Sequence, residues 1–137
     1  MDAKVIAVTG AASGIGYALA KLLATRSARV SMSDVSIDGL EKARTTITDS
    51  VPTISSTDIM TAACDVRDIK QVHAWLQKTV DTFGRLDGAA NIAGVISKYH
   101  GMEEGVLVNQ DESEWDFVLG VNLTVSCCGV YCHCQCC

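Results

Sequence analysis

The sequence predicts an α/β fold in which a parallel sheet is covered by helices. Short apolar runs that suit strands buried on both faces alternate with longer segments whose apolar residues recur at helical spacing. Strands that are separated by helices run parallel, because each connection crosses back over the sheet. With 137 residues, 48% of them hydrophobic, and a single proline, the chain is long enough to bury the core of one domain.

A glycine-rich turn joins the first expected strand to the first expected helix. The apolar run 5–8 ends at Thr9, and Gly10, Gly14 and Gly16 follow. Backbone N–H groups at the start of a helix lack partners within it, the helix dipole favours negative charge, and glycines let a pyrophosphate approach the main chain. The order of strand, glycines and helix therefore predicts a dinucleotide-binding turn, with an ordinary glycine turn as the alternative. The apolar residues that recur at the period of this helix are Ile15, Ala18, Leu19, Leu22 and Leu23.

An aspartate at the end of the second expected strand bears on the choice of cofactor. Asp34 follows the strand 28–33 and lies about 24 residues after Gly10. An acidic side chain at this place accepts hydrogen bonds from both hydroxyls of an adenosine ribose and repels a 2'-phosphate, so NAD is favoured over NADP. Val35 and Ser36 follow, with no arginine or lysine to receive that phosphate. The alternative is an exposed aspartate that caps the next helix.

The alternation of helices and strands continues through the rest of the chain. Apolar residues at helical spacing are Leu40, Ala43 and Ile47 in one segment and Ile69, Val72, Trp75, Leu76 and Val80 in another. Trp75 lies within its apolar stripe and is predicted to be a core residue. Further strands are expected over 59–64 and 86–93. Asp111 and Glu114 predict a capping box at the start of a last helix.

The glycine turn reads T-G-x-x-x-G-x-G from Thr9 to Gly16, and with it the chain resembles the short-chain dehydrogenase/reductase family over about residues 3–124. The resemblance implies a Rossmann-type, doubly wound parallel sheet, truncated to about four strands in the order 3-2-1-4. It also implies an NAD-dependent oxidoreductase, with NADP the less favoured cofactor. Such an enzyme transfers a hydride between nicotinamide and a small-molecule carbonyl or alcohol substrate.

The resemblance implies roles for residues after the first three strands. Asp65 would accept a hydrogen bond from the adenine amino group, and the backbone of Val66 would bind the adenine ring; an ordinary helix cap is the alternative for such an aspartate. Ser13 and Ile15 would lie close to the ribose and phosphates. The implied cofactor-binding residues are Thr9, Gly10, Ser13, Gly14, Ile15, Gly16, Asp34, Asp65, Val66, Asn91, Ala93 and Gly94.

The family pattern Asn-Asn-Ala-Gly is matched at Asn91, Ala93 and Gly94, and Ile92 departs from it. Small residues suit a place where a strand and a nicotinamide ribose approach closely, and an asparagine amide can tie neighbouring strands. Asn122 is an unfavourable residue inside a helix. The resemblance makes it the family's catalytic asparagine, which kinks the helix and holds a proton-relay water.

The resemblance ends near residue 124. Family members continue with a strand that bears a serine and a helix that bears Tyr-x-x-x-Lys, and neither can be placed here. The one Tyr-x-x-x-Lys runs from Tyr17 to Lys21, on the helix after the glycine turn and far from any substrate pocket. We therefore divide the chain into a cofactor-binding part, 1–124, and a Cys-rich tail, 125–137, and expect this chain alone to be inactive. A non-catalytic nucleotide-binding or interaction module is the alternative.

The tail holds six of the seven cysteines, between Cys127 and Cys137. A frameshift or unspliced intron, a soft-metal site that includes His133, lipidation of the terminal cysteine pair, a tail anchor and a merely tolerated tail are the competing explanations. Outside the tail the sequence predicts no metal site.

Composition narrows the classes of partner. A formal charge of −5 and the lack of a basic patch disfavour nucleic acid and anionic membranes, and no signal segment is evident, so a cytoplasmic location is expected. The expected strand 86–93 would have one unpaired edge with a single charge and no proline. Such an edge predicts an oligomer or an aggregate.

Overall fold

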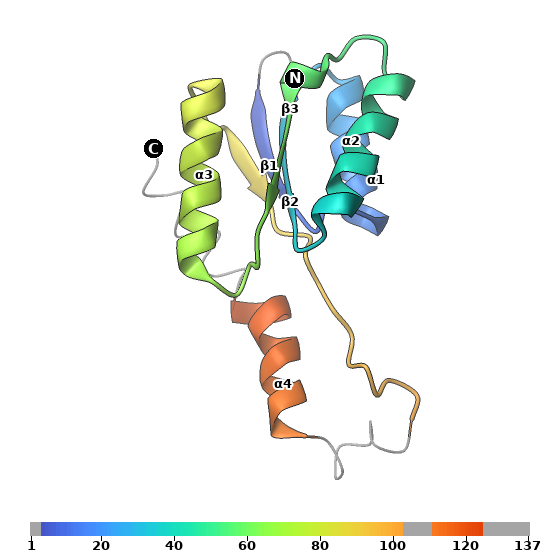
Figure 1. The fold of residues 1–137 in the computed structure, drawn as a ribbon, viewed down its shortest axis with the longest axis vertical. Helices are drawn as coiled ribbons and strands as arrows, with labels where there is room; N and C mark the ends of the chain where they lie inside the picture. Colours follow the sequence, from blue (N-terminus) through green and yellow to red (C-terminus); the bar gives the residue numbers. More distant parts are fainter. Residues whose placement is uncertain (1–3, 103–110, 125–137) are drawn as a thin grey trace.

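A computed structural model describes residues 4–102 and 111–124. Its sheet has four parallel strands in the order β3-β2-β1-β4 (Figure 1). The strands are β1 (Val5–Thr9), β2 (Arg29–Asp34), β3 (Ile59–Ala63) and β4 (Gly88–Ala90). The helices are α1 (Gly14–Thr25), α2 (Ile37–Ser50), α3 (Ile69–Phe83) and α4 (Glu112–Leu119), with a 3-10 turn at Ser56–Asp58 and a π-helical turn at Gly120–Thr124. The predicted fold class and strand order are confirmed.

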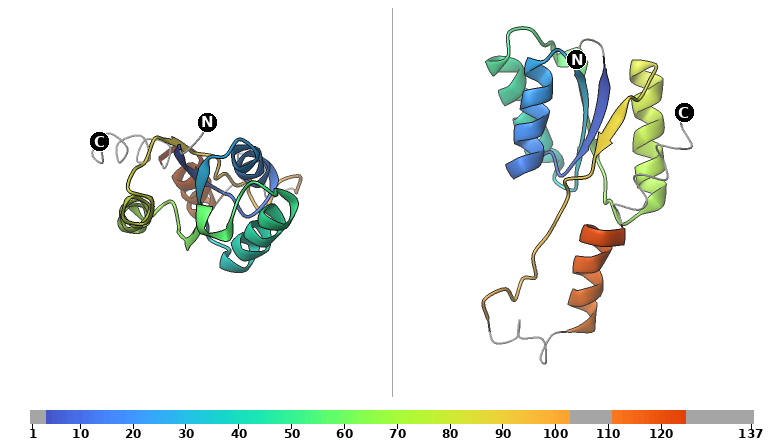
Figure 2. Two further views of the ribbon diagram at one scale, coloured as in Figure 1. Left: turned by 90° about the horizontal axis from the view of Figure 1, so that it is seen from above. Right: turned by 180° about the vertical axis from the view of Figure 1, so that it is seen from behind.

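Helices cover both faces of the sheet. In Figure 1 α1 and α2 lie on one face and α3 on the other, and Figure 2 shows the same division from behind. Successive side chains of a strand point to opposite faces. Accordingly Ile6 and Val8 pack in the core cluster under α1 and α2, whereas Val5 and Ala7 pack in the cluster under α3. The helix α4 extends beyond the carboxyl ends of the strands (Figures 1 and 2).

The helix α1 forms where the apolar period places a helix, and it buries mainly small residues. Its buried residues are Gly16, Ala20, Leu23 and Ala24. Of the apolar residues at helical spacing, Leu23 is buried, whereas Ile15 and Leu22 are 75% and 47% exposed. Small residues dominate the buried face because α1 packs closely against the turn that precedes it. A Cβ atom added to Gly16 would lie 2.1 Å from the carbonyl oxygen of Gly10.

A closed polar network lies in the core between β2 and α3. Trp75 is buried as predicted, and its Nε1 donates to the Ser31 hydroxyl at 2.8 Å. The Ser31 and Thr79 hydroxyls are 2.7 Å apart, and Thr79 donates to the carbonyl oxygen of Trp75. Ser33, also on β2 and fully buried, has a hydroxyl without a hydrogen-bond partner among the described residues. Of these two buried serines on β2, Ser31 thus has hydrogen-bond partners for its hydroxyl, whereas Ser33 has none among the described residues.

The predicted capping box at α4 forms only in part. Asp111 caps the helix, because its carboxylate accepts from the backbone N–H of Ser113 at 3.1 Å. Glu114 does not return to the cap; it is buried and accepts from the backbone N–H of Lys98 at 2.8 Å. A tertiary partner therefore replaces the local one.

Within the ranges 4–102 and 111–124, no helix is both long enough and apolar enough to cross a membrane. The tail 125–137 lies outside the described residues, so the explanations for its cysteines remain predictions.

Candidate nucleotide-binding site

The site is built where the parallel strands end. Residues that follow β1, β2, β3 and β4 meet at the carboxyl edge of the sheet, and the chain crosses to opposite faces on either side of β1. In open α/β sheets such a point is where a crevice forms and ligands bind. Three adjoining cavities lie along this edge, and Gly94 lines all of them.

The glycine turn packs tightly on one side and is open on the other. Gly10 has φ +65°, and a Cβ added to it would lie 2.8 Å from Cα of Ala93. Gly16 lies against the carbonyl oxygen of Gly10 in the same way. Gly14 has φ +54°, and nothing lies within 4 Å of an added Cβ. Gly10 and Gly16 are therefore required for packing, and Gly14 leaves open space in front of the helix α1.

A cavity of about 330 Å³ lies in front of this turn. It is lined by Gly10, Ser13, Gly14, Ile15, Gly16, Asp34, Ile92 and Gly94. Ser13 is the N-cap residue of α1, and its side chain makes no capping hydrogen bond. The exposed Ile15 adds an apolar surface at the same place. The combination offers backbone donors at a helix N-terminus beside a hollow of suitable size for phosphates.

Asp34 lies at the junction of this cavity with a second one of about 310 Å³. Its Oδ2 accepts from the backbone N–H of Ala12 at 3.2 Å, and its Oδ1 accepts from that of Ser36 at 3.1 Å. Ser36, not Asp34, is the N-cap of α2, because its side chain accepts from Gly39 N–H. Asp34 therefore ties the glycine turn to the end of β2 and keeps its carboxylate at the cavity edge.

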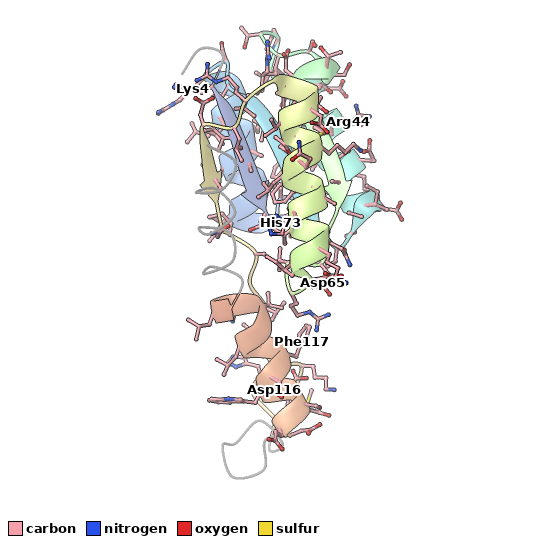
Figure 3. All side chains as sticks on the ribbon, turned by 90° about the vertical axis from the view of Figure 1, so that its left-hand side faces the viewer. Lys4, Arg44, Asp65, His73, Asp116 and Phe117 are labelled. Carbon is pink, nitrogen blue, oxygen red and sulfur yellow. The ribbon has the colours of Figure 1, made fainter. Side chains whose placement is uncertain are left out.

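The second cavity brings together residues from five segments of the chain. Gly10, Asp34, Asp65, Val66, Gly94 and Val121 all line it. Cys64 lines it as well, and burial raises the pKa of its thiol to about 11. Below the ends of the strands, Figure 3 shows Asp65 near the start of α3 and Phe117 on α4. Phe117 also lines this cavity.

Asp65 is engaged by a neighbour that the sequence did not single out. Arg67 Nε donates to Asp65 Oδ1 at 3.0 Å and to Oδ2 at 3.1 Å, and Nη2 also donates to Oδ2. These hydrogen bonds lower the pKa of Asp65 and raise the pKa of Arg67. The Arg67 guanidinium lies over the ring of Phe117, 4.9 Å from its centroid. The spacing of Phe117 and Val121, four residues apart, was the signal that could have placed both on one face of α4 and the π-helical turn that follows it.

The third cavity, of about 420 Å³, is lined by residues 93–96 and Asn122. The Asn122 amide clamps the backbone of Val95: its Oδ1 accepts from Val95 N–H at 2.8 Å, and its Nδ2 donates to Val95 C=O at 2.9 Å. Asn122 lies in the π-helical turn, where an interruption of the helix was expected. Its amide thus ties α4 to the segment after β4.

Thr9 and Asn91 stand apart from the other predicted site residues. Both line a small cavity of about 10 Å³ toward α3, and neither lines the three cavities of the edge. The Thr9 hydroxyl accepts from the backbone N–H groups of Ile92 and Ala93, at 2.9 and 3.0 Å. The strand β4 therefore ends at Ala90 and does not continue to residue 93 as expected, because the backbone N–H groups of Ile92 and Ala93 donate to a side chain and not to a neighbouring strand. Ile92 packs against the core cluster under α1 and α2.

Comparison with known proteins identifies the family. A family model for short chain dehydrogenases matches residues 4–132, and the chain belongs to this family. It is 48% identical over 121 residues to a short-chain dehydrogenase/reductase, aba4, of Botryotinia fuckeliana, covering 88% of this chain and 45% of that protein. It is 40% identical over 124 residues to chanoclavine-I dehydrogenase, easD, of Claviceps purpurea, covering 90% and 46%. The chain thus spans less than half of the length of these relatives.

Solved structures agree. A short chain dehydrogenase/reductase from Burkholderia phymatum in complex with NAD superposes with a TM-score of 0.85 at 26% identity, over 98% of this chain and 44% of that one. A metagenomic short-chain oxidoreductase in complex with NADP superposes with a TM-score of 0.82 at 27% identity, over 98% and 56%. Members of the family with this fold bind either dinucleotide.

Proposed function

We propose that residues 1–124 form the NAD-binding part of a short-chain oxidoreductase, with residues 125–137 as a separate tail. The observation that carries the choice of NAD is Asp34, whose carboxylate lies at the junction of two cavities with Val35 and Ser36 beside it. A carboxylate there accepts the ribose hydroxyls and repels a 2'-phosphate. The open space at Gly14 fits the same dinucleotide, because a phosphate can reach the backbone there.

Each edge residue then has a part in holding NAD. The backbone of the turn at Gly10, Gly14 and Gly16 receives the pyrophosphate, with Ser13 and Ile15 beside the ribose and phosphates. Asp65 and Val66 contact the adenine, and Ala93 and Gly94 back the nicotinamide ribose. When bound, NAD supplies the hydride acceptor of the family's chemistry.

The remaining predicted residues, Thr9, Asn91 and Asn122, lie around the end of β4. Thr9 holds the segment after β4 through two backbone N–H groups, and Asn91 lies in that segment and lines the small cavity toward α3. Asn122 is the proposed catalytic asparagine. In its present contacts it uses both amide atoms on Val95, which orients the wall of the third cavity.

The substrate of the whole protein is proposed to be a small molecule with a carbonyl or an alcohol group. One relative is named as a dehydrogenase of chanoclavine-I. We propose a cytoplasmic location, and association through the β4 edge, because β4 ends the described sheet.

Titration calorimetry with NAD and NADP tests the proposal. The 137-residue chain is expected to bind NAD more tightly than NADP, and the double variant Asp34→Ala with Val35→Arg is expected to reverse that order. A thermal melt must accompany the variant, because Asp34 also accepts from Ala12 and Ser36. Tighter binding of NADP than of NAD by the unmodified chain would refute the assignment of NAD as the cofactor.

The second candidate is a nucleotide-binding module without catalysis. It is favoured by the one Tyr-x-x-x-Lys of the chain, since Tyr17 lies on α1 and packs against the core cluster under α1 and α2. We therefore expect the 137-residue chain by itself to bind NAD and not to reduce carbonyl compounds. The family's Tyr-x-x-x-Lys, whose tyrosine is the positioned acid, cannot be placed in a substrate site of this chain. Such an acid is typically worth about 10² to 10⁴ in rate. Turnover by a preparation of verified intact mass would contradict this.

A further inference from the structure

The carboxylate proposed to receive the adenine amino group already has its acceptor positions filled. Oδ1 of Asp65 accepts from the backbone N–H of Arg67 at 3.0 Å and from Arg67 Nε at 3.0 Å. Oδ2 accepts from Nε at 3.1 Å and from Nη2. A carboxylate offers about four lone-pair sites. Little acceptor capacity is left for a base that brings an N–H donor.

The Arg67 side chain is held in this place from several directions. Asp65 lies on one side of the guanidinium, and the ring of Phe117 faces it with its centroid 4.9 Å away. The Arg67 methylene groups lie against Gly120, the C-cap residue of α4, since a Cβ added there would be 3.5 Å from Cδ and 3.7 Å from Cγ. A planar, bidentate guanidinium is preorganised by such contacts. Both Asp65 and Arg67 line the same 310 Å³ cavity.

We propose that Arg67 is a specificity residue that reads the edge of the nucleobase at the 6-position, and that it opposes the preference of Asp65. This inference rests on the proposed function, because it assumes that the base of the dinucleotide lies in the 310 Å³ cavity. A guanidinium has five N–H donors and no acceptor, so it favours a 6-oxo group. A bare carboxylate has only acceptors and favours a 6-amino group.

The two bases available for a test differ at this position. Adenine in NAD carries an amino group, and hypoxanthine in nicotinamide hypoxanthine dinucleotide carries an oxo group. With Arg67 in place, the hypoxanthine dinucleotide is expected to bind at least as tightly as NAD. In Arg67→Ala the Asp65 carboxylate is uncovered, and the ratio of affinities is expected to shift toward NAD by about tenfold or more, the size of one hydrogen bond to a charged group.

Titration calorimetry of the 137-residue chain and of Arg67→Ala with both dinucleotides measures this ratio. The ratio is internal to each protein, so a partly unfolded variant lowers both affinities together and leaves the ratio unchanged. Arg67→Lys keeps the charge and loses the bidentate donor. Its ratio of affinities is expected to lie between those of the unmodified chain and Arg67→Ala. Arg85→Ala is the matched control. Arg85 forms the same kind of pair with Asp87, which accepts from Val5 N–H at the opposite edge of the sheet.

The outcomes separate this inference from the proposed function. If both dinucleotides bind and Arg67→Ala leaves their ratio unchanged, or shifts it no more than Arg85→Ala does, Arg67 does not read the base and the inference is overturned. NADP is titrated in parallel; if Arg67→Ala weakens only NADP, the residue is a phosphate contact and the inference is again overturned. If neither dinucleotide binds to the unmodified chain, the proposed function fails and this inference fails with it.

Discussion

Replacing two glycines of the same turn separates packing from ligand binding. In Gly16→Ala the new Cβ would lie 2.1 Å from the carbonyl oxygen of Gly10 and 2.7 Å from its carbonyl carbon. Ordinary contacts at a Cβ are 3.4–4 Å, so backbone must move by more than 1 Å. In Gly14→Ala the new Cβ meets nothing within 4 Å, and the cost comes from φ +54°.

The magnitudes favour a clear difference in stability. Overpacking typically costs about 1–3 kcal/mol and occasionally more, and a clash between backbone atoms belongs at the upper end or beyond. Alanine regains about 1 kcal/mol of helix propensity. For Gly16→Ala we therefore expect a net loss of about 3 kcal/mol in the free energy of unfolding. For Gly14→Ala the left-handed conformation costs about 1–2 kcal/mol, and helix propensity does not offset this cost because φ +54° is not helical.

Urea unfolding followed by circular dichroism measures the stabilities. With a slope near 2 kcal/mol per molar urea, Gly16→Ala is expected to lower the midpoint by roughly 1.5 M. In NAD titrations we expect the opposite order: per folded molecule, Gly14→Ala should bind NAD more weakly than Gly16→Ala. The reason is that the Gly14→Ala methyl group projects into the space proposed for phosphate. The reasoning is refuted if Gly16→Ala is as stable as Gly14→Ala, or if Gly14→Ala binds NAD as tightly as the unmodified chain.

Two further predictions concern stability. Ser31→Ala should cost about 1–3 kcal/mol, because the buried Nε1–H of Trp75 loses its acceptor, whereas Ser33→Ala should cost nothing or be slightly stabilising; equal losses in urea unfolding would contradict the network. The pKa of Asp87 is held well below 3.8 by hydrogen bonds from Arg85, Val5 N–H and Lys4. Its contribution to stability is therefore present above about pH 4 and is lost as the pH falls toward the folded pKa, so Asp87→Asn should flatten the acid limb of the stability curve. The exposed Asp49→Asn is the control, and an acid limb equally steep in the two variants would disprove the assignment.

Much of the site was predictable because its signals are local. The run from Thr9 to Gly16 is a strand, a turn and a helix start in one short stretch, and the positive φ values of Gly10 and Gly14 follow from what only glycine adopts readily. Asp34 was predictable for the same reason, since it lies at the C-terminal end of a recognisable strand. All predicted site residues except Thr9 and Asn91 line the three cavities.

The misses came from contacts between distant segments. The strand β4 ended early because the Thr9 hydroxyl takes two of the N–H groups that follow it. The Glu114 carboxylate accepts a hydrogen bond from the backbone N–H of Lys98 and not from the cap residue of its own helix. In each case a partner far along the chain competed with a local pattern.

By itself, the sequence determined the class of fold, the glycine turn and the position of the acidic residue Asp34 at the end of β2, because these depend on hydrophobic period and on conformations of single residues. Only the tertiary structure decided that Asp65 is covered by Arg67, that Phe117 faces the guanidinium, and that Asn122 clamps Val95. Hydrogen bonds and ring contacts form within a few ångströms. Whether residues from separate segments come within that range is set by the packing of the whole domain.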